Sequence, residues 1–188
     1  MDNDKSVVIK ENNTAKIYHI RNNHEYGKFI LFYQDSYLEI ICHTTYGTYG
    51  HIWSSPGKSA YEFMLKMSFN TFVEKMSEGR HLIVDHDKQE ETMIKKVIEV
   101  GNENNWSEKE IEYQKSLVQE ICHCGYVNSE EFRMLICASE LYENIYDEDY
   151  ENIEIEEMIH PHLESLWNEL WVPLMTKIKE EKIGRAHV

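Results

Sequence analysis

Four segments near the start of the chain are rich in β-branched and aromatic residues, and only short turns separate them. They are residues 15–21 (AKIYHIR), 28–34 (KFILFYQ), 36–44 (SYLEIICHT) and 48–54 (TYGHIWS). This composition is typical of β-strands. Gaps of at most six residues suit hairpins but are too short for the crossovers that parallel strands need. The sequence therefore predicts an antiparallel sheet of about four strands over residues 15–54.

The hydrophobic period becomes helical after Pro56. Ser59 and Glu62 have the spacing of a capping box, which predicts a helix start. A one-sided apolar stripe then follows at Phe69, Phe72, Val73 and Met76. The chain is therefore expected to leave the sheet for helices at this point.

Short signals divide the middle of the chain. Residues 81–84 (HLIV) fit a last short strand, and a helix is expected over about residues 90–100. Residues 107–110 (SEKE) repeat the capping-box pattern. Asn128 or Ser129 is expected to cap the next helix.

The final predicted helix has a wide apolar face. Its members are Leu163, Leu166, Trp167, Leu170, Trp171 and Leu174. Pro173 should kink or shorten this helix. The two tryptophans either pack on the sheet as core or form a face for a partner or a homodimer.

These elements predict one α+β domain over residues 1–182. Its N-terminal sheet would pack against a C-terminal set of about five helices within residues 59–182. Residues 183–188 (IGRAHV) match what a common sequencing adaptor encodes in one reading frame. We therefore expect residues 183–188 to be an artefact and not part of the natural protein.

Composition excludes several classes of protein. A pI near 5.1 argues against direct binding to nucleic acid, which needs clustered Lys and Arg. No apolar run approaches the roughly 20 residues that span a membrane, and the N-terminus lacks a signal peptide. The four cysteines do not form a disulfide framework, so a reducing cytoplasm is expected.

One long stretch of the chain is strongly acidic. Residues 134–176 contain no Lys or Arg and eleven carboxylates, which account for −11 of the formal net charge of −15. Tyrosines are interleaved with the acids. The expected partner-binding residues are Glu140, Glu143, Asp147, Glu148, Asp149, Glu151, Glu154 and Glu157, with Tyr142, Tyr146 and Tyr150.

The spacing of these acids suggests how they would be displayed. Glu140, Glu143 and Asp147 would share one helix face, and Glu151, Glu154 and Glu157 could form a second such row. A row of carboxylates can occupy a groove built for nucleic-acid phosphates, with Tyr rings adding contact area. The alternative is an ordinary solvated face of an acidic protein.

Two clusters of side chains could bind a metal ion or take part in catalysis. Cys122, His123 and Cys124 could hold zinc together with His160 and His162, although their spacing is not that of zinc modules.

The second cluster comprises His81, Asp85, His86 and Asp87, whose His-Asp pair is similar to that of metal phosphohydrolases. The sequence contains no phosphate loop, nucleophile elbow or dinucleotide fingerprint. No catalytic residue, metal or cofactor is therefore assigned.

Residues 46–53 (YGTYGHIW), with Gly57, residues 61–63 (YEF) and residues 69–76, resemble a pattern in small accessory proteins of tailed phages. In that pattern an aromatic strand and a glycine turn precede a helix. The resemblance covers about a fifth of the chain and implies a phage origin. It carries no catalytic residue, and it suggests an anti-CRISPR or other anti-defence inhibitor only by analogy.

Three functions are compatible with these observations. The first is a non-enzymatic inhibitor in the host bacterial cytoplasm, whose acidic face binds the basic nucleic-acid-binding surface of a defence protein. The second is a sponge for a nucleotide immune signal, using Lys16, Arg21, Lys28, Tyr18 and Tyr33. The third is a metal-dependent hydrolase built on the cluster from His81 to Asp87.

Overall fold

The computed structural model describes residues 8–12, 15–34, 37–57 and 59–185. The chain divides into two compact units. The sheet unit comprises residues 1–81 and 160–188, and the helical unit comprises residues 82–159. The sequence predicted one domain over residues 1–182, and no linker-like composition marks the division between the units. Residues 186–188 of the expected artefact lie outside the described residues.

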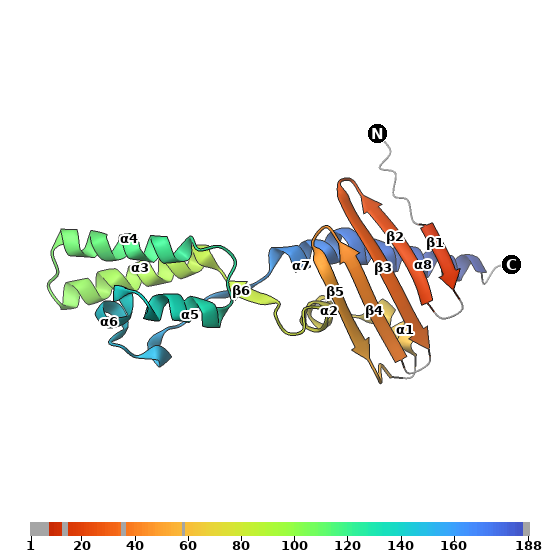
Figure 1. The fold of residues 1–188 in the computed structure, drawn as a ribbon, viewed down its shortest axis with the longest axis horizontal. Helices are drawn as coiled ribbons and strands as arrows, with labels where there is room; N and C mark the ends of the chain where they lie inside the picture. The colour runs from red at the N-terminus through yellow and green to blue at the C-terminus, as the bar shows by residue number, and fades with distance from the viewer. Residues whose placement is uncertain (1–7, 13–14, 35–36, 58, 186–188) are drawn as a thin grey trace. The chain divides into compact units, whose positions relative to one another are not determined.

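The sheet unit contains a five-stranded antiparallel sheet in which each strand pairs with its neighbour in the chain (Figure 1). The strands are β1 (Val8–Asn12), β2 (Ala15–Asn22), β3 (Glu25–Gln34), β4 (Tyr37–Thr44) and β5 (Gly47–Trp53). The predicted α+β class and the four predicted strands are confirmed. β1 was missed because most of its sequence, VIKEN, is polar.

One face of the sheet forms the core of the sheet unit. Buried side chains alternate along the strands, as a half-buried sheet requires. Tyr18 on β2 is paired with Phe29 on β3, and Leu31 on β3 is paired with Ile40 on β4. All four side chains are fully buried.

Helices from both ends of the unit cover this face. They are α1 (Ala60–Lys66), α2 (Phe69–Met76), α7 (Pro161–Ser165), the π-helical segment η2 (Leu166–Trp171) and α8 (Val172–Arg185). Figure 1 shows α8 crossing behind the strands. Ser59 and Ser68 cap α1 and α2 by accepting backbone N–H groups, which confirms the predicted start at Ser59.

Trp171 holds the C-terminal helices on the sheet. Its side chain is 1% exposed, and its ring centroid lies 6.0 Å from that of Phe29 on β3 and 4.7 Å from that of Phe72 on α2. Trp167 is half-buried, with its ring 5.2 Å from Phe72. Trp171 therefore packs in the core of the sheet unit and does not form a face for a partner.

The predicted shortening at Pro173 does not occur, because α8 runs through the proline to Arg185. A π-helical segment lies just before the proline instead. In a regular α-helix the carbonyl of Glu169 would accept the N–H of residue 173, which proline lacks. The buried side chain of Asn22 on β2 replaces that donor. Its Nδ2 lies 3.2 Å from the carbonyl oxygen of Glu169 and 2.6 Å from the carboxylate Oε2 of the same residue.

The helical unit begins and ends with a two-stranded antiparallel ladder of β6 (Leu82–Val84) and β7 (Glu157–Ile159). Between them lie α3 (His86–Glu103), α4 (Glu108–Cys122), α5 (Ser129–Cys137), α6 (Glu140–Tyr146) and the 3₁₀ turn η1 (Tyr150–Asn152). Figure 1 shows α3 and α4 as an antiparallel pair. A complete capping box opens α4 at Ser107, as the sequence predicted. Of the two residues expected to cap the next helix, Asn128 does so, and it too forms a capping box. α3 starts four residues before the predicted Glu90, because the side chain of Asp85 caps it.

The replacement Asn22→Leu is expected to destabilise the protein by about 1–3 kcal/mol, because it removes the part-buried hydrogen bonds that Asn22 donates to Glu169. In a Pro173→Ala background the cost should fall, since an alanine at this position restores a backbone N–H. The measurement is the free energy of unfolding in denaturant for the four proteins of this cycle. An unchanged cost in the Pro173→Ala background would contradict the proposed pairing of Asn22 with the proline.

Candidate functional site

The helical unit carries the whole formal net charge of the protein. It contains 21 Asp and Glu against 6 Lys and Arg, a net charge of −15, whereas the sheet unit contains 13 of each kind. A surface of one sign attracts partners of the opposite sign and raises the rate of encounter. A charged interaction site is therefore expected in the helical unit.

The carboxylates between α6 and β7 form a surface that we call the acidic surface. All of its members are exposed. They are Glu140, Glu143, Asp147, Glu148, Asp149, Glu151, Glu154, Glu156 and Glu157.

The first predicted helical row is shorter than expected. Glu140 and Glu143 lie in the first turn of α6, but the helix ends at Tyr146. Asp147 is the C-cap, with a left-handed φ of 56°, and Glu148 has the same φ. Asp is one of the few residues that enter this conformation readily. The row that was to include Asp147 therefore stops at Glu143.

The second predicted row does not exist as a helix face. Glu151 lies in η1, Glu154 lies in an irregular segment and Glu157 begins β7. The fully buried side chain of Gln89 on α3 holds this irregular segment in place. Its amide donates to the carbonyl of Glu154 at 3.2 Å and accepts the N–H of Glu156 at 2.7 Å. This contact joins residues far apart in the chain, so no local pattern reveals it.

The three tyrosines do not share one environment. Tyr146 is 3% exposed and belongs to the core, where burial raises the pKa of its hydroxyl to about 12. Tyr142 is half-buried, and Tyr150 is 39% exposed. The acidic surface therefore has the ring of Tyr150 and part of Tyr142 available, but not the ring of Tyr146.

Two basic side chains reach this region from other helices. Lys96 on α3 donates to the carbonyl of Asn152, and Arg133 on α5 donates to the carbonyl of Ile153, each at 3.3 Å. The fold thus supplies cations that the sequence between residues 134 and 176 lacks. Among the described residues, neither cation forms an ion pair with a carboxylate of the acidic surface. The negative charge of this surface therefore remains available.

Apolar side chains are exposed on the same unit. Met134 and Leu135 on α5 are 64% and 39% exposed, and α5 packs against α6. Tyr113 on α4 is 49% exposed, and the charge of Glu140 raises the pKa of its hydroxyl. Apolar and aromatic groups of this kind commonly anchor protein interfaces, while charges steer the approach.

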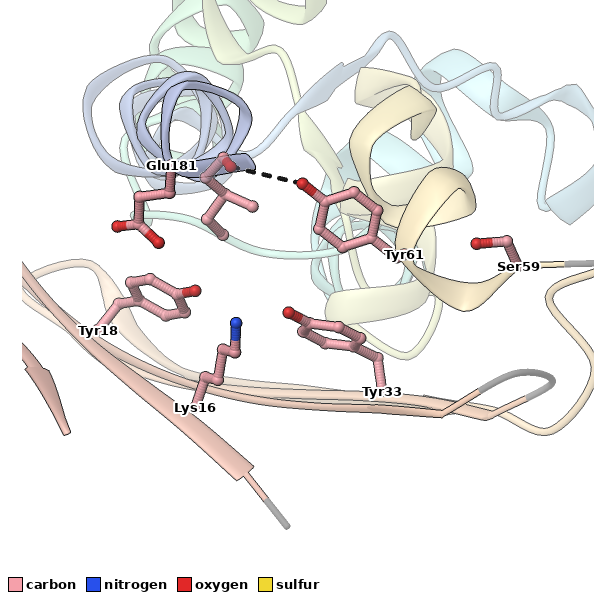
Figure 2. Close-up of a pocket in the computed structure, with 7 residues that line it drawn as sticks. Lys16, Tyr18, Tyr33, Ser59, Tyr61 and Glu181 are labelled. Atoms are coloured by element: carbon pink, nitrogen blue, oxygen red, sulfur yellow. Dashed lines mark hydrogen bonds between the residues drawn. The ribbon is translucent and has the colours of Figure 1, made fainter. Parts of the chain in front are cut away.

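The sheet unit has a pocket of about 380 Å³ between β2, β3, α1 and α8. Figure 2 shows Lys16, Tyr18 and Tyr33 rising from the sheet, with Tyr61 and Glu181 facing them from the helices. Three of the five residues expected for a nucleotide site, Lys16, Tyr18 and Tyr33, are brought together here. The other two, Arg21 and Lys28, lie on the opposite face of the sheet by strand alternation.

The possible zinc ligands have separate environments. Cys122 is buried at the end of α4, and burial raises the pKa of its thiol to about 12. Cys124 is exposed, and the Nδ1 atom of His123 hydrogen-bonds the carbonyl of Gln119 at 2.6 Å. Over the described ranges, no three His, Cys, Asp or Glu side chains come together as a metal site. The zinc hypothesis gains no support from this geometry.

In the cluster from His81 to Asp87, which suggested a hydrolase, Asp85 and His86 make contacts that support the local fold. Asp85 caps α3 and forms an ion pair of 2.9 Å with Lys88, which lowers the pKa of its carboxyl group. The Nε2 atom of His86 hydrogen-bonds the carbonyl of Gly125. The cap and the ion pair account for the carboxyl group of Asp85, whereas the Nδ1 atom of His86 is buried and has no hydrogen-bond partner among the described residues.

A protein-family model described as a phage family matches residues 7–180 of the chain. This match confirms the phage origin that the resemblance over residues 46–76 implied. No curated protein and no solved structure matches the chain significantly. Across the described residues, no helix has the length and apolar character needed to cross a membrane.

Cys124 is expected to react with a thiol reagent such as DTNB well before Cys42 and Cys122, because burial raises the pKa of both latter thiols to about 12. Cys137 is half-buried, so the comparison is made in a Cys137→Ser background. There the replacement Cys124→Ser should remove the fast phase of the reaction, which is followed by the absorbance of the released thiolate. A fast phase that survives this replacement would contradict the assignment. Joint protection of Cys122 and Cys124 that a chelator abolishes would instead support the zinc site.

Proposed function

The chain belongs to this phage family, and we propose that it is an anti-defence inhibitor of the anti-CRISPR kind. It acts in the host bacterial cytoplasm and has no catalytic activity of its own. Its acidic surface binds a bacterial defence protein on a basic surface that normally binds nucleic acid.

The separation of charge between the two units carries this proposal. A protein that only needed solubility could spread its negative charge over its whole surface. Here the helical unit has a net charge of −15 and the sheet unit a net charge of zero. Like charges held close together destabilise a fold. A function in binding explains why such a concentration is maintained.

The acidic surface also has the features that such binding requires. Its carboxylates are exposed, and no Lys or Arg in the described part of the chain neutralises them through an ion pair. Met134 and Leu135 add exposed apolar area on the neighbouring helix. Charge would guide the encounter, and apolar burial would slow dissociation. Binding of this kind excludes nucleic acid by occupying its site.

The triple replacement of Glu140, Glu143 and Glu151 by Lys is expected to reduce binding to the target at least tenfold. Asp147 is left unchanged, since Lys at its left-handed φ would strain the turn. The tagged protein is used to capture partners from bacterial lysates that express defence systems. A captured nucleic-acid-binding protein should be retained at low salt and released at high salt, because salt screens exposed charges.

The matched control changes the same amount of charge elsewhere on the helical unit. Glu99, Glu103 and Glu108 are exposed on α3 and α4 and can likewise be replaced by Lys. This control should still bind and should still displace nucleic acid from the purified partner. Equal binding by both triple variants, or displacement that persists after the changes on the acidic surface, would refute the proposal.

A further inference from the structure

The pocket of the sheet unit is enclosed by strands on one side and by helices on the other. Its floor is the inner face of β2 and β3, which contributes Lys16, Tyr18 and Tyr33 (Figure 2). Its walls are the start of α1, with Tyr61, and the last turns of α8, with Glu181. The volume of about 380 Å³ lies at the small end of the range of ligand pockets, about 300–1,000 Å³. It would accommodate a nucleoside but not a large dinucleotide.

Glu181 supplies a hydrogen-bond acceptor inside this pocket. Its Oε1 atom is buried, and it accepts no hydrogen bond from any residue that the structure describes. Buried carboxylate oxygens normally have a partner, because burial removes their hydration. The negative charge of Glu181 also contributes to a raised pKa of the Tyr61 hydroxyl, after burial and the neighbouring Tyr33. A ligand with N–H donors would satisfy this carboxylate.

Lys16 supplies the opposite chemistry in the same pocket. Its Nζ atom lies 5.7 Å from the centroid of the Tyr33 ring, and Figure 2 shows the ammonium group directed toward the hydroxyls of Tyr18 and Tyr33. An ammonium group has only donors to offer. The pocket therefore presents a cationic donor from the sheet and an anionic acceptor from α8.

Aromatic surface lies beside these two charges (Figure 2). The rings of Tyr33 and Tyr61 are 5.6 Å apart and tilted by 48°. Their faces suit a flat, unsaturated ring system, because such rings bury area and interact through their quadrupoles. A complementary ligand is therefore a flat ring with N–H donors at one place on its edge and acceptors beside them.

We propose that this pocket binds the guanine ring of a guanine nucleoside or nucleotide. Guanine has N–H donors at N1 and N2, which would pair with the carboxylate of Glu181. Its O6 and N7 atoms are acceptors, and lysine is a common donor to both. One of the tyrosine rings would pack on a face of the base. The site is distinct from the acidic surface, so it does not depend on the proposed inhibitor function.

The same chemistry discriminates against adenine. Adenine has an unprotonated N1 and no amino group at C2, so it cannot give two donors to Glu181 at that edge. Its N6 amino group is a donor and would face the ammonium group of Lys16, where guanine has the acceptor O6. A site built to hydrogen-bond specific groups rejects an analogue that lacks them.

The test is isothermal titration calorimetry of the full chain with guanosine and, separately, with adenosine. Guanosine should bind at least tenfold more tightly than adenosine. The replacements Lys16→Met and Glu181→Gln should each weaken guanosine binding by about 10- to 100-fold, since each removes a hydrogen bond to a charged group. Circular dichroism melting of each variant verifies that it is folded.

Matched controls come from the same elements. Arg21 is exposed on β2 outside the pocket, and Glu180 is exposed on α8 and paired with Lys177 at 3.6 Å. Arg21→Met and Glu180→Gln should bind guanosine as the unaltered protein does. Absence of guanosine binding, equal affinity for adenosine, or full affinity in the two folded pocket variants would overturn the proposal.

Discussion

The packing of Trp171 against Phe29 and Phe72 is the contact on which the sheet unit depends. These rings join β3 and α2, early in the chain, to a helix that follows residues 82–159 of the helical unit. Without that return the inner face of the sheet would lose the cover of η2 and α8. The sheet core is therefore complete only when η2 and α8 pack on the strands and α2. The pocket beside α8 depends on the same packing.

Local sequence patterns predicted most of the elements and few of the contacts between them. Strand composition predicted β2 to β5, and side-chain capping predicted the starts of α1, α4 and α5. These signals work because a strand or a helix end is stabilised by residues close in sequence. β1 was not predicted, because its mostly polar composition is also typical of a loop.

The features that were missed depend on partners far away in the chain. Gln89 shapes the backbone around Glu154, so the acidic stretch leaves the helical conformation that its spacing suggested. Tyr146 enters the core because the helices of its unit enclose it. The division into units was also hidden, because no linker composition marks residues 81 and 160. For the site, sequence identified the exposed acids and three pocket residues, but not Tyr61 or Glu181.

The chain enters and leaves the helical unit through adjacent backbone. The N–H of His160 donates to the carbonyl of His81 at 2.8 Å, and β6 continues from one residue while β7 leads into the other. A short turn would therefore be enough to connect the two parts of the sheet unit directly. In genetic terms, residues 82–159 form a cassette. The acidic surface could be gained, lost or exchanged among phages, while the sheet and its pocket kept a continuous core.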